Sequence, residues 1–171
     1  MGLGTMSEKS SNNERTKRLI VIRLRGRVSV KWKIEDTLKM LNLHKVHHAN
    51  IVDDRKSYVG MLQKVKDYVT WGILDEGTCI HLLKKRARLV GNEPLTDDYI
   101  KKHTKFQSIE EFSKAFMNFK AEIKDLPHVK PVFRLHPPRK GFKYTKKRPF
   151  GDYGELGFRN EQVQELVERM L

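Results

Sequence analysis

The sequence predicts a small α/β sandwich of the α+β kind, with two layers and helices covering one face of a sheet. Three observations support this fold class. Strand-like and helix-like patterns alternate through the first 74 residues, and helical patterns follow up to residue 127. Beyond that point lies a basic, proline-containing segment with neither periodicity, which is expected to run outside the packed layers.

Residues 16–74 are predicted to form a βαβα core. The β-rich run Arg18–Gly26 indicates a strand that ends at a glycine. Apolar residues at i, i+4 and i+7 from Ile34 indicate a helix, and Lys45–Val52 is a second strand candidate. A second helix carries its apolar stripe on Tyr58, Met61, Leu62, Val65, Tyr68 and Val69. The short apolar run Trp71–Leu74 leaves its type of structure open.

The rest of the chain divides by pattern and composition. Residues 75–127 are predicted to be a helical insertion, in which Ser108 and Glu111 form a capping box. Residues 128–136 are expected to be the last core strand, residues 137–158 an extended basic segment, and residues 159–171 a C-terminal helix. Residues 1–15 are polar and rich in Ser and Asn, which predicts a disordered tail.

Charge is the strongest compositional signal. The 171 residues carry a formal net charge of +14, which favours a polyanionic partner, nucleic acid first and an anionic membrane second. Two blocks hold the excess, because residues 15–33 and residues 128–149 each contain eight Lys and Arg and no acid. No segment has the ~20 apolar residues of a membrane span, and no helix pairs a basic face with a strongly apolar one. The single cysteine, Cys79, excludes an intrachain disulfide and favours a reducing compartment.

The second block has the chemistry of an RNA-binding strip. Pro137 and Pro138 favour an extended path, and Gly141 permits a bend. Phe142 and Tyr144 stand among the cations, where an aromatic ring can stack on an unpaired base. Such a segment buries too little to order itself but gains counterion release on a phosphate-lined surface. We expect it to fold on RNA, with a solvated linker as the alternative. Its predicted contacts are Arg134, His136, Arg139, Lys140, Phe142, Lys143, Tyr144, Lys146, Lys147 and Arg148.

The first block predicts a more rigid contact. Arg23, Arg25 and Arg27 are spaced by two, so in a strand their side chains would share one face or edge. Lys31 and Lys33 follow at the start of a helix, where backbone amides also attract phosphate. The predicted RNA-binding set is completed by Arg55, Lys56 and Lys64.

Enzyme and metal sites are not predicted. His44, His47 and His48 lack a second cluster of ligands, and in a strand the last two would point to opposite faces. Asp53-Asp54 stands at a turn, where aspartate is common, and Cys79 has no catalytic His and Asp context. No glycine loop suits a nucleotide phosphate. The sequence therefore predicts no catalysis, metal, cofactor or small-molecule substrate.

The run "RLIVIRLRGRVSVKWKIEDTLKMLNLHKVHHANIVDD", followed by "SYVGMLQKVKDYVTWG", closely resembles the large-subunit ribosomal protein family L-thirty. "RARLVGNEPLTDDYI", "FRLHPPRKGF" and "GDYGELGFRNEQVQELVERML" are similar to its long archaeal and eukaryotic form, which is related to eukaryotic L-seven. The resemblance covers about residues 16–171. Chain length and a short, weakly basic start favour the archaeal form.

This resemblance implies a βαβαβ ferredoxin-like core with an insertion before the last strand. It also implies a structural, non-enzymatic protein of cytoplasmic ribosomes that binds large-subunit rRNA near 5S rRNA and adjoins other ribosomal proteins. The alternative is an extra-ribosomal RNA-binding or RNA-annealing protein that uses the same residues.

Overall fold

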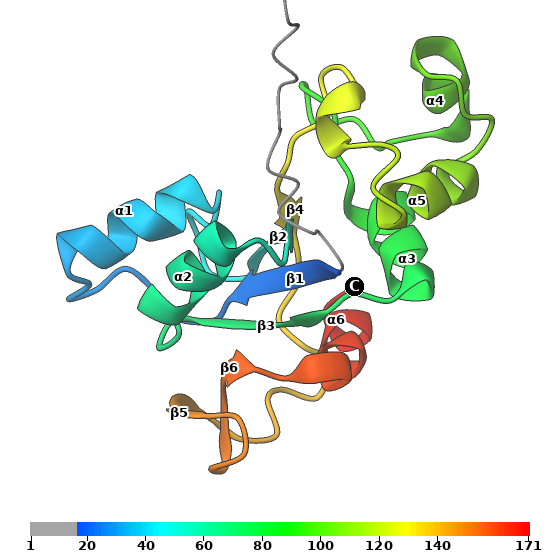
Figure 1. Cartoon of the computed structure of the whole chain (residues 1–171). Helices are drawn as coiled ribbons and strands as arrows, with labels where there is room; N and C mark the ends of the chain where they lie inside the picture. The colour runs from blue at the N-terminus through cyan, green and yellow to red at the C-terminus, as the bar shows by residue number, and fades with distance from the viewer. Residues whose placement is uncertain (1–16) are drawn as a thin grey trace, which may run out of the picture.

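Figure 1 shows the computed structural model, which describes residues 17–171; the predicted tail, residues 1–15, lies outside them. The strands are β1 (Arg18–Arg23), β2 (His48–Asp53), β3 (Val69–Ile73), β4 (Phe133–Arg134), β5 (Thr145–Pro149) and β6 (Gly154–Phe158). The helices are α1 (Trp32–Met40), α2 (Lys56–Lys64), α3 (Glu76–Arg86), α4 (Asp97–His103), α5 (Ile109–Met117) and α6 (Val163–Met170). Two short 3₁₀ turns, η1 (Ile123–Asp125) and η2 (Asn160–Gln162), complete the described elements.

The sheet is built around β1, with the strand order β4-β2-β1-β3-β6-β5. β1 pairs antiparallel with β2 on one side and with β3 on the other. All six of its residues are buried, and alternation sends Leu19 and Val21 to one core cluster and Ile20 and Ile22 to another. β1 is hydrophobic on both sides because helices cover both faces of the sheet.

The first face is covered by α1 and α2. Leu38 and Leu62 are fully buried there against β1 and Trp71, in the stripes that helical periodicity predicts. The run Trp71–Leu74, whose type the sequence leaves open, supplies most of strand β3 and the residue after it. The predicted βαβα core of residues 16–74 therefore needs correction to βαβαβ, because its third strand lies before residue 75.

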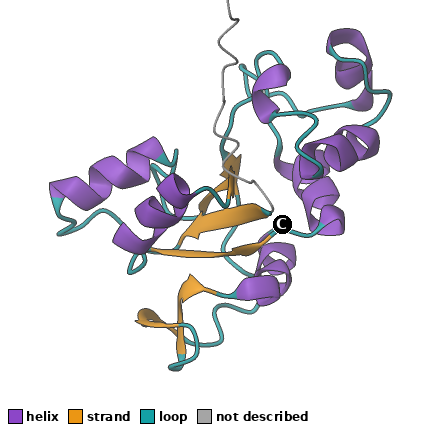
Figure 2. Cartoon of the chain, viewed as in Figure 1, coloured by secondary structure: helices purple, strands orange, loops and turns teal. Residues whose placement is uncertain are grey.

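The second face is covered by the insertion and the C-terminal helix. Figure 2 shows α1 and α2 on one side of the strands and α3, α5 and α6 on the other. Phe112 and Phe116 of α5 are buried there, and the Ser108 hydroxyl accepts from the Glu111 N–H at 3.2 Å, as the capping box predicts. The Glu111 carboxylate accepts from the N–H of Gln107 at 2.8 Å, one residue before the expected donor. The mixed α/β fold class is confirmed, with this extra layer of helices.

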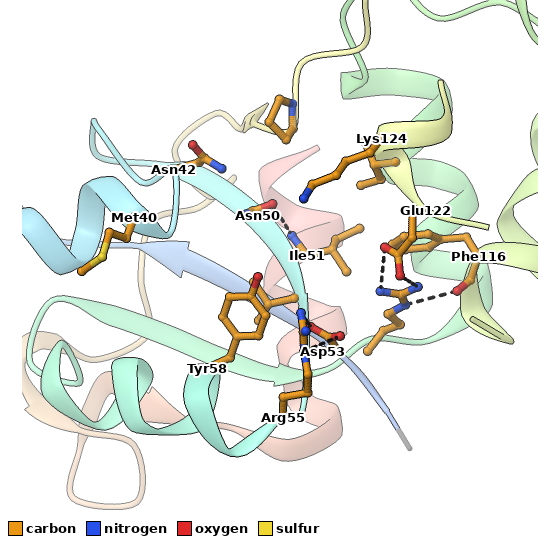
Figure 3. Close-up of a pocket in the computed structure, with 14 residues that line it drawn as sticks. Met40, Asn42, Asn50, Ile51, Asp53, Arg55, Tyr58, Phe116, Glu122 and Lys124 are labelled. Carbon is orange, nitrogen blue, oxygen red and sulfur yellow. Dashed lines mark hydrogen bonds and ion pairs between the residues drawn. The ribbon is translucent and has the colours of Figure 1, made fainter. Parts of the chain in front are cut away.

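Arg18 fastens the insertion to the core. Its guanidinium is 3% exposed and lies 4.1 Å from the ring centre of Phe116 and 4.2 Å from that of Phe119. Its Nη2 lies 3.2 Å from a carboxylate oxygen of Glu122. Arg18 also lines a cleft of about 310 Å³ between β2, α1 and the insertion, where Figure 3 shows Phe116 and Glu122 side by side. Charge and ring contacts thus add to the apolar packing that joins the insertion to the sheet.

The predicted last strand, residues 128–136, is neither long nor last. β4 has two residues, which pair with His48 and Ala49 at the edge of β2. Prolines at positions 131 and 137 have no N–H to donate and limit how far such a ladder can extend. The predicted extended segment, residues 137–158, contains β5 and β6. β6 runs parallel to β3, with Thr70 opposite Gly157.

A buried ion pair explains how β6 is held. Glu155 and Arg159 are both almost fully buried and bonded to each other, and Arg159 Nε donates to the Thr70 hydroxyl at 2.9 Å. Burial lowers the pKa of Arg159 to about 10, so the guanidinium stays charged at neutral pH. This pair connects β6 to β3 at the start of the turn into α6.

Candidate nucleic-acid interface

The two basic blocks meet in the folded chain. The connection from β1 to α1, residues 24–31, and strand β5 lie on either side of an open hollow of about 410 Å³. It is lined by Leu24, Arg25, Gly26, Val28, Val46, Tyr68, Lys146 and Lys147. Cations more than 100 residues apart in sequence therefore border one concave surface, which gives the fold a place for a polyanion.

Arg25 is oriented at the rim of this hollow. Its Nη1 donates to the Asp67 carbonyl at 3.1 Å, and its guanidinium lies 5.0 Å from the ring centre of Tyr68. The side chain is partly exposed. A guanidinium held in this way keeps other N–H donors for a phosphate and loses little entropy on binding.

Arg23 does not belong to this surface, and its prediction as an RNA contact is corrected. Its side chain is fully buried and donates to the carbonyl of Leu43 at 2.8 Å and to that of Arg25 at 2.9 Å. It also donates to a Glu35 carboxylate oxygen at 3.0 Å. The spacing-of-two argument fails because β1 ends at Arg23. The irregular backbone that follows leaves carbonyls without ladder partners, and the guanidinium supplies their donors.

The other cations of the first block that were predicted as RNA contacts are exposed. Arg27 is 67% exposed but paired with Glu35 at 2.9 Å. Lys31 and Lys33 flank Trp32 at the start of α1, whose first turn has no side-chain cap from residue 31. Trp32 was not predicted as a site residue, although an aromatic ring between two lysines was a visible signal.

The second block is exposed but anchored. The His136 N–H donates to the Met170 carbonyl at 2.9 Å, and the Arg139 N–H to the Arg169 carbonyl at 2.8 Å. These bonds satisfy carbonyls at the C-terminal end of α6, which lack partners within the helix. The prediction of a strip that orders only on RNA therefore needs correction over its first part.

The two aromatic residues of the second block, Phe142 and Tyr144, differ in their burial. Phe142 is half-buried, with its ring centre 6.3 Å from that of His47 and 5.2 Å from Lys146 Nζ. Burial and then Lys146 hold the pKa of His47 below its ordinary value. Phe142 thus packs the strip against the core beside His47. Tyr144, by contrast, is 48% exposed and packs edge-on against Tyr153.

Two cations of the strip are paired with acidic side chains. Lys143 Nζ lies 2.8 Å from Glu165, whose pKa this hydrogen bond lowers, and Arg148 lies 3.9 Å from Asp152. The other cations of the strip that were predicted as RNA contacts form no ion pair with an acid within residues 17–171; they are Arg134, Arg139, Lys140, Lys146 and Lys147. They are all exposed and so present unneutralised charge.

The predicted residues Arg55, Lys56 and Lys64 are not gathered with the others. The register pairs Arg18 with Asp53, so Arg55 lies at the opposite end of β1 from Arg23. Arg55 pairs with Asp53 at 2.9 Å and borders the cleft of Figure 3. Lys56 begins α2 at that end, and Lys64 ends it nearer the hollow; both are exposed.

Among residues 17–171, no group of three or more His, Cys, Asp or Glu side chains is arranged to hold a metal ion. No helix in this described part of the chain is long and apolar enough to cross a bilayer.

Comparisons with known proteins agree with the resemblance seen in the sequence. A model of the family described as Ribosomal protein L30p/L7e matches residues 19–69. The large ribosomal subunit protein uL30 of Methanopyrus kandleri is 48% identical over 149 residues, which are 86% of this chain and 100% of that protein. The uL30 proteins of Archaeoglobus fulgidus and Methanosphaera stadtmanae are 51% and 47% identical over 88% of this chain, and 97% and 98% of theirs. All three organisms are archaea, in agreement with the archaeal form that chain length and the short, weakly basic start favour.

Proposed function

Because the chain belongs to the ribosomal protein L30p/L7e family, we propose that it binds large-subunit rRNA through the hollow between the β1–α1 connection and β5. Membership of this family makes the protein a structural, non-enzymatic component of the large ribosomal subunit, on cytoplasmic ribosomes. The contact with rRNA and its position near 5S rRNA go beyond family membership and are our proposal.

One observation carries the proposal: the two acid-free blocks border a single concave surface. Arg25 lies on one side of it, and Lys146 and Lys147 lie on the other. Like charges in such proximity repel each other in the free protein, and a phosphate chain between them would relieve that repulsion. Binding would hold RNA segments against a rigid sheet, and so stabilise their arrangement.

Salt dependence of binding to deproteinised archaeal large-subunit rRNA tests this surface. We compare the triple variant Arg25→Ala, Lys146→Ala, Lys147→Ala with a matched control that neutralises Lys101, Lys102 and Lys105 around α4. Loss of three phosphate contacts reduces the slope of log K against log salt by about 2–3. The control is expected to keep the wild-type slope. Equal losses in both variants would mean diffuse charge attraction and would refute the assignment.

Proximity to 5S rRNA is tested with a tethered cleavage reagent. A Lys147→Cys variant accepts the reagent selectively, because Cys79 is fully buried and burial raises its pKa to about 11. After assembly into large subunits, cleavage is expected within 5S rRNA or the rRNA that adjoins it. Cuts confined to distant rRNA would refute this placement.

Retention on the particle separates a ribosomal role from loose RNA binding. The wild-type protein is expected to co-sediment with large subunits after a high-salt wash, whereas an extra-ribosomal RNA-annealing protein would be removed.

A further inference from the structure

Two large apolar side chains stand in solvent between β1 and the first turn of α1, and one of them, Val28, lines the hollow. Trp32 is 74% exposed and Val28 is 92% exposed, in the connection from β1 and the first residue of α1. Single exposed apolar residues are normal, but tryptophan is highly buried on average. Trp71, the other tryptophan, is 6% exposed and packed under α1 and α2. Trp32 therefore has a large ring surface that the fold leaves uncovered.

Several cations lie near Trp32 in the sequence, together with the acids Glu35 and Asp36 of the same helix. Lys31 and Lys33 are its neighbours in sequence, and Lys33 Nζ lies 5.6 Å from the ring centre, near the ~6 Å limit of a cation–π contact. Arg27 is 67% exposed in the same connection, and its partner Glu35 is shared with the buried Arg23. An apolar protein surface would have to desolvate these cations, whereas a nucleotide offers them its phosphates.

From this combination we infer that Trp32 stacks on an unpaired base of the bound RNA, with the adjoining phosphates on Lys31 and Lys33. The inference rests on the proposed function and specifies the RNA, because a base inside a duplex has no free face to offer. Trp32 is the first residue of α1, which positions its ring, and Val28, four residues earlier, lines the hollow. The bound site would thus include a bulged or single-stranded nucleotide.

The full-length protein is titrated with hexa-adenylate, hexa-uridylate and heparin, a polyanion without bases. Stacking quenches the emission of Trp32, while buried Trp71 supplies a constant background. We expect quenching by hexa-adenylate, less by hexa-uridylate and none by heparin. Trp32→Leu should weaken hexa-adenylate binding about 5- to 150-fold and heparin binding by less than about twofold. Trp32→Phe, which keeps an aromatic face, should retain most of the affinity.

The outcomes separate this inference from the proposed function. Salt-dependent RNA binding that Trp32→Leu does not weaken would overturn the stacking alone. An equal loss for heparin would overturn it too, because the effect would then be electrostatic or structural. If Trp32→Leu binds RNA normally but is lost from salt-washed subunits, Trp32 contacts a protein instead. Failure of the wild-type protein to bind hexa-adenylate while it binds deproteinised large-subunit rRNA would overturn the stacking alone, and failure to bind that rRNA would refute the proposed function itself.

Discussion

Replacing Arg23 by methionine should destabilise the fold without acting on its RNA surface. The side chain is fully buried, and its five N–H donors serve one carboxylate and several carbonyls, including those of Leu43 and Gly26. Methionine keeps most of the apolar stem but has no N–H donor. The carbonyls lose this donor, and among residues 17–171 Glu35 keeps its ion pair with Arg27 alone.

The magnitude follows from the contacts. Removing one partner of a buried, hydrogen-bonded ion pair costs about 3–5 kcal/mol. For a domain of this size, each kcal/mol lowers the melting temperature by about 2–4 °C, so we expect a fall of about 6–20 °C. Arg23→Lys keeps the charge but not the planar fork, and its loss should be intermediate.

Thermal and urea unfolding of Arg23→Met and Arg25→Met measure this difference. Arg25 is partly exposed, so its loss should cost under about 1 kcal/mol while lowering the salt slope of RNA binding by about 0.7–0.9. Arg23→Met, measured below its melting temperature, should keep the wild-type slope. A stability loss below about 1 kcal/mol for Arg23→Met, or a changed slope, would refute its structural role.

Three further outcomes are expected. Gly72→Ala would put a Cβ 2.1 Å from the Asn160 carbonyl oxygen, so urea unfolding should show that the free energy of unfolding falls by at least ~2 kcal/mol. Gly60→Ala is the control: nothing lies within 4 Å of the added Cβ, so its stability should be unchanged or raised. Cys79, with its pKa raised to about 11, should resist iodoacetamide at pH 8 in the native protein and react rapidly in urea, as mass spectrometry can follow; equal rates would contradict its burial. The pKa of His47 is lowered, so the folded state resists protonation of this side chain. The contribution of neutral His47 to the free energy of unfolding should be fully present above pH 6.5 and fall as the pH drops below that value. Urea midpoints measured against pH should show this fall, and His47→Gln should flatten it.

The elements that depend on local pattern were predictable. Helical periodicity placed the buried faces of α1, α2 and α5, and the Ser108 signal marked the start of α5 to the residue. The two basic blocks and their separation are also properties of the sequence alone. Such features depend on residues within a few positions of each other, so they can be identified without a structure.

Strand β6 was missed for the opposite reason. "GELGF" has no alternating pattern, and its burial depends on Glu155 and Arg159 pairing with each other beside Thr70 of β3. The same limit applies to Arg18, which reads as one more basic residue until Phe116, almost 100 positions away, is placed beside it.

By itself, the sequence determined that this protein carries two unneutralised cationic blocks, a mixed α/β core and the motifs of a ribosomal protein family. Only the tertiary structure decided which cations face outward. Arg23 and Arg25 have the same chemistry and stand two residues apart, yet one is enclosed by carbonyls and the other lies at an open rim. Charge is a property of a side chain, whereas burial depends on every segment that packs around it, so the second cannot be derived from a local pattern.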